Sequence, residues 1–132
     1  MSRPAHGSQP RPAIVLLHGW TWPENDPSWG MVSVALEFQQ AGFTVLVPIM
    51  RGWAPSGGRD DCAGEQVDDA LRALAWLGQQ GQVDADNLFL AGYSQGGQVA
   101  LLAAAQNAPV RAVADVVLLP FEAVGLLFDV LD

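Results

Sequence analysis

Residues 88–97 read Leu-Phe-Leu-Ala-Gly-Tyr-Ser-Gln-Gly-Gly, and they decide how the rest of the chain is interpreted. The first four residues of this stretch are apolar, as in a buried strand, and a long apolar pattern with helical spacing follows it. This order predicts a strand, then a sharp turn with Ser94 at its apex, then a helix over about 95–107. Gly92 and Gly96 flank the serine because the strand and helix backbones pass too close there for a Cβ.

The pattern Gly-x-Ser-x-Gly between a strand and a helix is typical of a nucleophile elbow. In such a turn the backbone of the serine is strained, and its Oγ stands clear of the sheet. The N-terminal N–H groups of the following helix point to the same place, where they would stabilise a developing oxyanion. The alternative is an ordinary strand-to-helix turn in which Ser94 caps the helix.

The composition limits the classes of function. The chain has 132 residues, of which half are apolar and 15% are charged, so it predicts one globular domain with a hydrophobic core. Its net charge is −8 and all six basic residues are arginine, so we expect neither nucleic acid nor a membrane surface as a partner. The absence of lysine excludes Schiff-base chemistry and a Walker A site. One cysteine and two histidines argue against a dedicated zinc site, and we expect no metal and no cofactor.

The N-terminal segment is expected to be an extended arm. Residues 1–12 contain three prolines among polar residues and include His6. They lack the apolar core of a signal peptide, and no apolar run in the chain approaches the length of a membrane span. The sequence therefore predicts a cytoplasmic protein.

Apolar strand patterns alternate with amphipathic helix patterns along residues 13–132, which we expect to form a single domain. The predicted strands cover residues 13–17, 43–47, 88–91 and 113–119. The predicted helices begin near Ser28, which would be the N-cap of the first, and near Gly64, Gln95 and Phe121. Strands that are apolar on both faces and alternate with helices indicate an α/β fold with a parallel four-stranded sheet flanked by helices.

Acidic residues crowd the start of the predicted helix that begins near Gly64. They are Asp60, Asp61, Glu65, Asp68 and Asp69. We expect their carboxylates to favour the positive end of the helix dipole, and the alternative is a metal site.

Three stretches in a fixed order resemble one known superfamily. Residues 14–20 read IVLLHGW, residues 41–58 read AGFTVLVPIMRGWAPSGG, and residues 83–97 read VDADNLFLAGYSQGG. Together with the alternation of elements, they make the chain similar to the α/β-hydrolase superfamily, and within it to the dienelactone hydrolase and prolyl-oligopeptidase-like branch of esterases and peptidases. The resemblance implies a partial α/β-hydrolase core.

The resemblance also implies roles for particular residues. Ser94 would be the nucleophile of an acyl-enzyme mechanism, and its oxyanion hole would use the backbone N–H groups of Gln95 and Trp20. Aromatic residues near the carboxyl ends of the strands would either line an acyl or ring pocket or serve as ordinary packing. These residues are Trp22, Trp53 and Tyr93.

The chain departs from the superfamily because it has no histidine after Ser94, where the triad acid and histidine normally follow in chain order. The strands that usually carry those two groups are missing, as are the strands that usually precede the His-Gly segment, so we expect a core truncated at both ends. His18 is a candidate base, although the resemblance gives its position a part in shaping the oxyanion loop. His6 is a more remote candidate, and Glu122 would orient a base or belong to the surface.

These features predict a serine hydrolase that acts weakly on a small-molecule ester, lactone or peptide bond. The alternative is a catalytically inactive fragment of the same fold, or a binding module. A flavodoxin-like nucleotide binder has the same alternation of elements, but no strand here is followed by G-x-G-x-x-G. If the strand order follows the superfamily, strand 113–119 is a sheet edge. Either the amphipathic tail folds over this edge, or we expect homodimer formation or aggregation through it.

Overall fold

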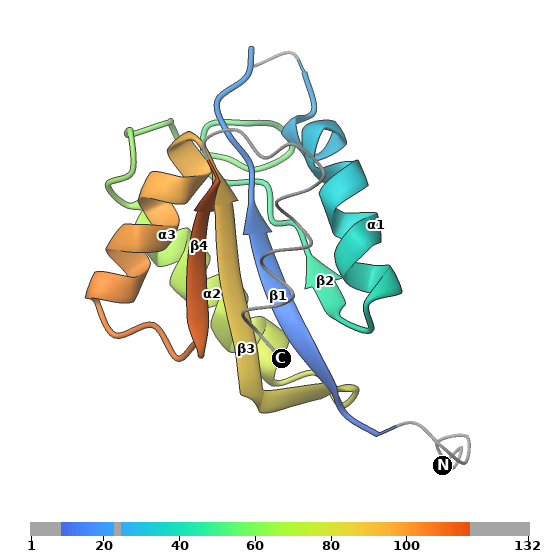
Figure 1. The fold of residues 1–132 in the computed structure, drawn as a ribbon. Helices are drawn as coiled ribbons and strands as arrows, with labels where there is room; N and C mark the ends of the chain where they lie inside the picture. The colour runs from blue at the N-terminus through green and yellow to red at the C-terminus, as the bar shows by residue number, and fades with distance from the viewer. Residues whose placement is uncertain (1–8, 23–24, 117–132) are drawn as a thin grey trace.

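The structure is a computed structural model that describes residues 9–22 and 25–116 (Figure 1). Strands and helices alternate along these residues, as the sequence predicts. In chain order the elements are β1 (Arg11–Leu17), the 3-10 helix η1 (Pro27–Met31), α1 (Val32–Gln40), β2 (Thr44–Leu46), α2 (Gln66–Gly78), β3 (Val83–Tyr93), α3 (Gln95–Ala105) and β4 (Ala112–Val116).

The strands form one parallel sheet in the order β2-β1-β3-β4. Helix α1 covers one face of this sheet, and α2 and α3 cover the other face (Figure 1). The predicted parallel four-stranded sheet flanked by helices is therefore confirmed. Because parallel strands end at the same edge, the carboxyl ends of all four strands lie together, where α/β sheets commonly bind ligands.

The core consists of one apolar layer on each side of the sheet. Along β1, Val15 and Leu17 belong to the layer under α2 and α3, whereas Ile14 and Leu16 belong to the layer under α1. All four side chains are at most 2% exposed. The strand is buried on both faces, which explains its continuous apolar sequence.

The third strand is longer than predicted. It pairs with β1 from Val83 onward, but the register shifts between the pairs Arg11↔Val83 and Ala13↔Leu88. Residues 84–87 lie inside this irregularity, where the carboxylate of Asp84 accepts a hydrogen bond from the backbone N–H of Asp86 at 3.0 Å. The strand therefore begins before Leu88 and contains a bulge at these residues.

The prediction that Ser28 caps the first helix is wrong. Asp26 is the N-cap of η1, and its Oδ1 accepts hydrogen bonds from the backbone N–H of Ser28 at 2.9 Å and from its hydroxyl at 2.7 Å. Pro27 takes the first helical position, which suits its fixed φ and its missing N–H. The cap therefore lies upstream of the proline.

Several predictions fall outside the described residues. They concern residues 1–8 of the arm, which include His6, residues 117–119 of the fourth strand, and the tail with Phe121 and Glu122. The predicted end of the arm at residue 12 is wrong, because β1 begins at Arg11, which pairs with Val83. The described part of the fourth strand is β4, at one edge of the sheet. Among the described residues, no helix is both long enough and apolar enough to cross a membrane.

Candidate active site

Ser94 lies at the junction of β3 and α3, at the carboxyl edge of the sheet. Its backbone has φ 53° and ψ −113°, a combination outside the regions that residues other than glycine ordinarily adopt. Such strained residues persist only where the surrounding structure holds them, and they are frequent at active sites. The local geometry is that of a kinked junction with an exposed serine at its apex.

The side chain of Ser94 is not used by the helix that follows it. Ser94 occupies the N-cap position of α3, but its side chain makes no capping hydrogen bond. The alternative in which this serine serves as an ordinary helix cap is therefore wrong. Within residues 9–22 and 25–116 the hydroxyl has no hydrogen-bond partner, which leaves Oγ accessible to a substrate.

Gly92 and Gly96 permit the close approach that the elbow requires. A Cβ on Gly92 would collide with the backbone of Gly96, and a Cβ on Gly96 would collide with the carbonyl oxygens of Leu17 and His18. The first turn of α3 therefore lies directly against the end of β1 as well as the end of β3. This contact brings the start of the loop after β1 next to Ser94.

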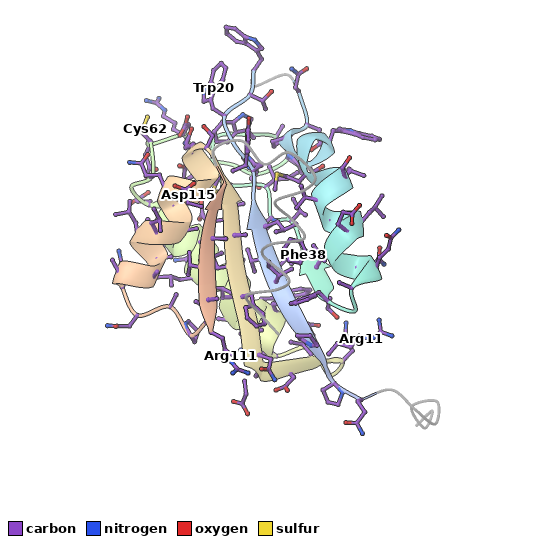
Figure 2. All side chains as sticks on the ribbon, viewed as in Figure 1. Arg11, Trp20, Phe38, Cys62, Arg111 and Asp115 are labelled. Atoms are coloured by element: carbon purple, nitrogen blue, oxygen red, sulfur yellow. The ribbon has the colours of Figure 1, made fainter. Side chains whose placement is uncertain are left out.

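The two N–H groups predicted for an oxyanion hole belong to segments that meet at this elbow. Gln95 is the first residue of α3, where a backbone N–H has no acceptor within the helix. Trp20 follows Gly19, which packs so closely on Tyr93 that a Cβ on Gly19 would lie 2.8 Å from the ring and 3.1 Å from the carbonyl oxygen of Tyr93. Figure 2 shows Trp20 beyond the carboxyl ends of the strands. The donor roles of Gln95 and Trp20 stay predictions.

His18 is a buried neutral residue that ties two loops together. It is 1% exposed, its Nδ1 donates to the carbonyl oxygen of Gly19 at 2.9 Å, and its Nε2 accepts from the backbone N–H of Met50 at 3.0 Å. Burial lowers the pKa of His18 below its ordinary value. Both ring nitrogens are engaged, so the structure does not bring this predicted candidate base into hydrogen-bond contact with Ser94.

The aromatic residues predicted near the site divide into two groups. Trp53 is 1% exposed, its Nε1 donates to the carbonyl oxygen of Thr21 at 3.0 Å, and its ring packs edge-on against His18, so it serves as packing. Trp20 and Trp22 are more than half exposed and contact each other edge to face at 5.0 Å. Trp20 and the exposed Tyr93 line a hollow of about 210 Å³ beside the elbow. A role for Trp22 and Tyr93 in lining an acyl or ring pocket stays a prediction.

The acidic cluster at the start of α2 has structural roles. The carboxylate of Asp61 accepts hydrogen bonds from the backbone N–H groups of Gly64 at 3.0 Å and Gln66 at 3.4 Å, which satisfies free donors at the helix start. In the described part of the chain, no group of three or more histidine, cysteine or acidic side chains is arranged to hold a metal ion. The helix-dipole interpretation is thus the one that the contacts support.

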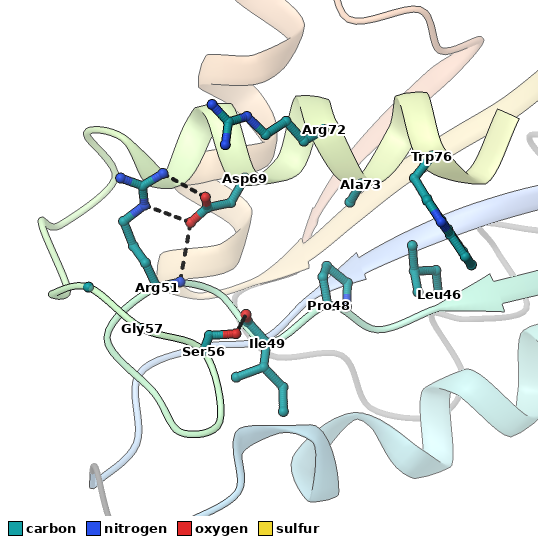
Figure 3. Close-up of a pocket in the computed structure, with 11 residues that line it drawn as sticks. Leu46, Pro48, Ile49, Arg51, Ser56, Gly57, Asp69, Arg72, Ala73 and Trp76 are labelled. Carbon is teal, nitrogen blue, oxygen red and sulfur yellow. Dashed lines mark hydrogen bonds and ion pairs between the residues drawn. The ribbon is translucent and has the colours of Figure 1, made fainter. Parts of the chain in front are cut away.

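An ion pair closes the loop between β2 and α2. Arg51 donates to the two carboxylate oxygens of Asp69 at 2.9 and 2.7 Å (Figure 3). It also pairs with Glu65. Although partial burial favours the neutral acid, the hydrogen bonds from Arg51 hold the pKa of Asp69 below its ordinary value. The apolar hollow beside this pair is lined by Leu46 and Trp76 among others, and none of its lining residues belongs to the elbow at 92–96.

One set of contacts at the elbow was not predicted from the sequence. The side-chain Nε2 of Gln95 donates to Oδ1 of Asp60 at 2.7 Å and to Oε1 of Gln66 at 2.9 Å. The sequence pattern predicts only an interaction with the helix dipole for Asp60, and it predicts no role for Gln66. No local sequence pattern predicts a contact between residues so far apart in the chain.

The fold and the elbow together define the class of protein. The family model described as alpha/beta hydrolase fold matches residues 12–121, and the chain belongs to this family. It is 36% identical over 69 residues to the uncharacterized peptidase YtmA of Bacillus subtilis (strain 168), a match that covers 52% of this chain and 27% of that protein. It is 30% identical over 98 residues to dipeptidyl aminopeptidase BIII of Pseudoxanthomonas mexicana, a match that covers 70% of this chain and 14% of that protein.

Solved structures share the same fold. The alpha/beta hydrolase GrgF from Penicillium sp. sh18 matches with a TM-score of 0.69 and 30% identity, over 81% of this chain and 37% of that chain. The protein XC6422 from Xanthomonas campestris, described as an a/b serine hydrolase without lid, matches with a TM-score of 0.66 and 24% identity, over 85% of this chain and 51% of that chain. This chain therefore spans about half or less of the length of these relatives and structures.

Proposed function

We propose that Ser94 is the nucleophile of a serine hydrolase, and that this chain acts weakly on a carboxylic ester, lactone or peptide bond. The observation that carries the proposal is the backbone of Ser94, because φ 53° and ψ −113° hold an exposed hydroxyl at a strand-to-helix junction. Membership of the alpha/beta hydrolase family and the peptidase names of two relatives support the same class of reaction.

In the proposed reaction, Oγ of Ser94 attacks the carbonyl carbon of the substrate, and the proton of the Ser94 hydroxyl passes to solvent water. The oxyanion that forms accepts hydrogen bonds from the backbone N–H groups of Gln95 and Trp20. When the intermediate collapses, the bond from carbon to the leaving oxygen or nitrogen breaks, and the leaving group takes up a proton to depart as an alcohol or amine. Water then attacks the acyl-enzyme in the same way and restores the Ser94 hydroxyl.

The slow step in this proposal is removal of the proton from Ser94. Serine is a weak nucleophile without a base, and both nitrogens of His18 already have partners in the protein. When triad members are missing, an oxyanion hole and substrate binding still leave catalysis of about 10³–10⁴ over water. Because this residual catalysis does not need the serine, we propose slow turnover in which attack by Ser94 adds a further contribution.

Active-serine labelling and ester turnover test the nucleophile. Wild type should react with a fluorophosphonate probe and release p-nitrophenol slowly from a p-nitrophenyl ester, whereas Ser94→Ala should not be labelled and should release p-nitrophenol more slowly than wild type. Equal background in both proteins would remove Ser94 from catalysis and would favour the second candidate, an inactive fragment or binding module.

Added imidazole tests whether the base is what limits the rate. If a positioned base is lacking, imidazole should accelerate ester turnover by wild type beyond its own effect on Ser94→Ala. Turnover at ordinary enzyme rates with no response to imidazole would show that a base is already in place, and would contradict the proposed weakness.

A further inference from the structure

The side chain of the residue after Ser94 is held by a loop that is distant in the chain. Nε2 of Gln95 donates one hydrogen bond to Oδ1 of Asp60 at 2.7 Å and another to Oε1 of Gln66 at 2.9 Å. The partners are 35 and 29 residues away in the sequence. Both hydrogens of the Gln95 amide are therefore used by the segment that precedes and begins α2.

Gln66 has no freedom to turn away from Gln95. Its side chain is fully buried, at 0% exposure. Its Nε2 donates to the carbonyl oxygen of Arg51 at 3.2 Å and to Asp60 at 2.9 Å, while its Oε1 accepts from the backbone N–H of Ala63 at 3.0 Å and from Gln95. Two donors and two acceptor sites are the whole capacity of a glutamine side chain, and all four are occupied.

Asp60 is fixed just as firmly. Its Oδ1 accepts a third hydrogen bond from the backbone N–H of Cys62 at 3.0 Å, so three N–H donors share the charge of one carboxylate oxygen. Its backbone packs against Gly52, which has φ 102° and where a Cβ would come within 2.8 Å of the Cα of Asp60. The loop that carries Asp60 is closed further by the pair between Arg51 and Asp69.

The contacts of Asp60 and Gln66 hold the side chain of Gln95, whose backbone N–H is needed in the proposed reaction. Gln95 supplies the N–H predicted to face the oxyanion, and the peptide that contains this N–H joins Gln95 to the strained Ser94. A strained backbone keeps its conformation only when its surroundings fix it. Oxyanion donors are effective only when they are held in place before the charge develops.

We propose that Asp60 and Gln66 are positioning residues that fix the peptide between Ser94 and Gln95 by holding the Gln95 side chain. This inference rests on the proposed function for its catalytic consequence. Neither residue touches the reacting atoms, so both act through Gln95.

Kinetics of three variants test the catalytic consequence. Asp60→Ala and Gln66→Met remove the acceptors of Gln95, and kcat for a p-nitrophenyl ester should fall by about 10- to 100-fold while KM changes little. Asp60→Asn keeps a carbonyl oxygen that can accept from Gln95, so this conservative variant should recover most of the rate. A general loss of folding would lower the active fraction without separating Asp60→Asn from Asp60→Ala.

Asp61→Ala is the matched control. Asp61 lies on the same loop and caps α2 through Gly64 and Gln66, but it makes no side-chain contact with Gln95. It should lower stability and leave kcat within about twofold of wild type. If Asp61→Ala lowers kcat as much as Asp60→Ala, the effect belongs to the loop as a whole and the positioning role is wrong.

NMR of the Gln95 backbone amide tests positioning without any need for activity. Its signal should shift and its order parameter should fall in Asp60→Ala and Gln66→Met but not in Asp61→Ala. If wild type shows no Ser94-dependent turnover and the amide still responds, the proposed function fails and the positioning role stands. If the amide and the rate are both unchanged in Asp60→Ala and Gln66→Met, the positioning role is overturned.

Discussion

The buried ring of His18 accepts a hydrogen bond from the backbone N–H of Met50 at 3.0 Å, which ties the end of β1 to the loop after β2. The loop after β1 carries Trp20, a predicted oxyanion donor, and the loop after β2 carries Asp60, a proposed positioning residue. The same bond requires Nε2 to be unprotonated, and the partner bond to Gly19 places the proton on Nδ1. The histidine predicted as a base thus has a structural task that depends on its being neutral.

Stability should therefore fall in acid through His18. Burial lowers its pKa below 6.5 in the folded state, so below that pH the unfolded chain binds a proton that the folded chain does not. The contribution of His18 to the free energy of unfolding should not change with pH above pH 6.5. Below pH 6.5 it should decrease by at most about 1.4 kcal/mol per pH unit.

His18→Gln isolates this contribution. The amide can still accept from Met50 but cannot titrate, so the variant should be less stable than wild type by about 1 kcal/mol above pH 6.5. The difference should narrow as the pH falls below that value. Urea unfolding on both sides of pH 6.5 measures the difference in stability between the two proteins. A difference that does not change with pH would show that the pKa of His18 is the same in the folded and unfolded states.

A second prediction concerns the contact between α3 and the end of β1. Gly96→Ala would place a Cβ on the carbonyl oxygens of Leu17 and His18, which are backbone atoms that cannot turn aside. We expect a loss of about 3 kcal/mol or failure to fold, as for severe overpacking. Gly81→Ala is the control, because a Cβ there meets nothing within 4 Å, and it should stay within about 0.5 kcal/mol of wild type. Similar unfolding midpoints for the two variants would contradict this account.

The elbow and the strands were predictable because their signals are local. The Gly-x-Ser-x-Gly turn needs particular residue types at fixed spacing, and a strand such as β1 that is buried on both faces must be continuously apolar. The cap of η1 was misplaced although its signal is also local, since Pro27 marks the first helical position and Asp26 the cap before it.

The supporting contacts of the site could not be predicted, because they join residues that only the fold brings together. Gln95 meets Asp60 across 35 residues, and glutamine and aspartate carry no pattern that announces such a pairing. The solvent exposure of the aromatic side chains could not be predicted either. Trp53 and Trp20 both follow strands, yet Trp53 is 1% exposed and Trp20 is 52% exposed. Packing between loops determines these differences in exposure, and the spacing of residues in the sequence does not predict that packing.

A third prediction tests the strain at Ser94. Glycine adopts φ 53° and ψ −113° more easily than serine, so Ser94→Gly should raise the free energy of unfolding by about 1 kcal/mol while it removes the turnover that uses the Ser94 hydroxyl. Ser33→Gly makes the same chemical change inside α1, where it should lower stability by about 0.5–1 kcal/mol. Urea unfolding of both variants gives the two signs, and a loss of stability in Ser94→Gly would mean that this backbone is not strained.

The last prediction concerns β4, which is one edge of the sheet within the described residues. Arg111 donates its backbone N–H to Leu88 at 2.8 Å, and alternate N–H groups of a parallel strand point the same way. The N–H of Ala114 should therefore face away from β3, where no described strand lies, and we propose that it pairs there with a second copy of the chain in a homodimer. Ala114→Pro removes this donor in a place where edge strands tolerate proline, so it should weaken the dimer, whereas Ala114→Ser keeps the N–H and should not. Sedimentation equilibrium measures both, and a wild-type chain that stays monomeric at every concentration, or a dimer that Ala114→Pro leaves equally strong, would rule out pairing through β4.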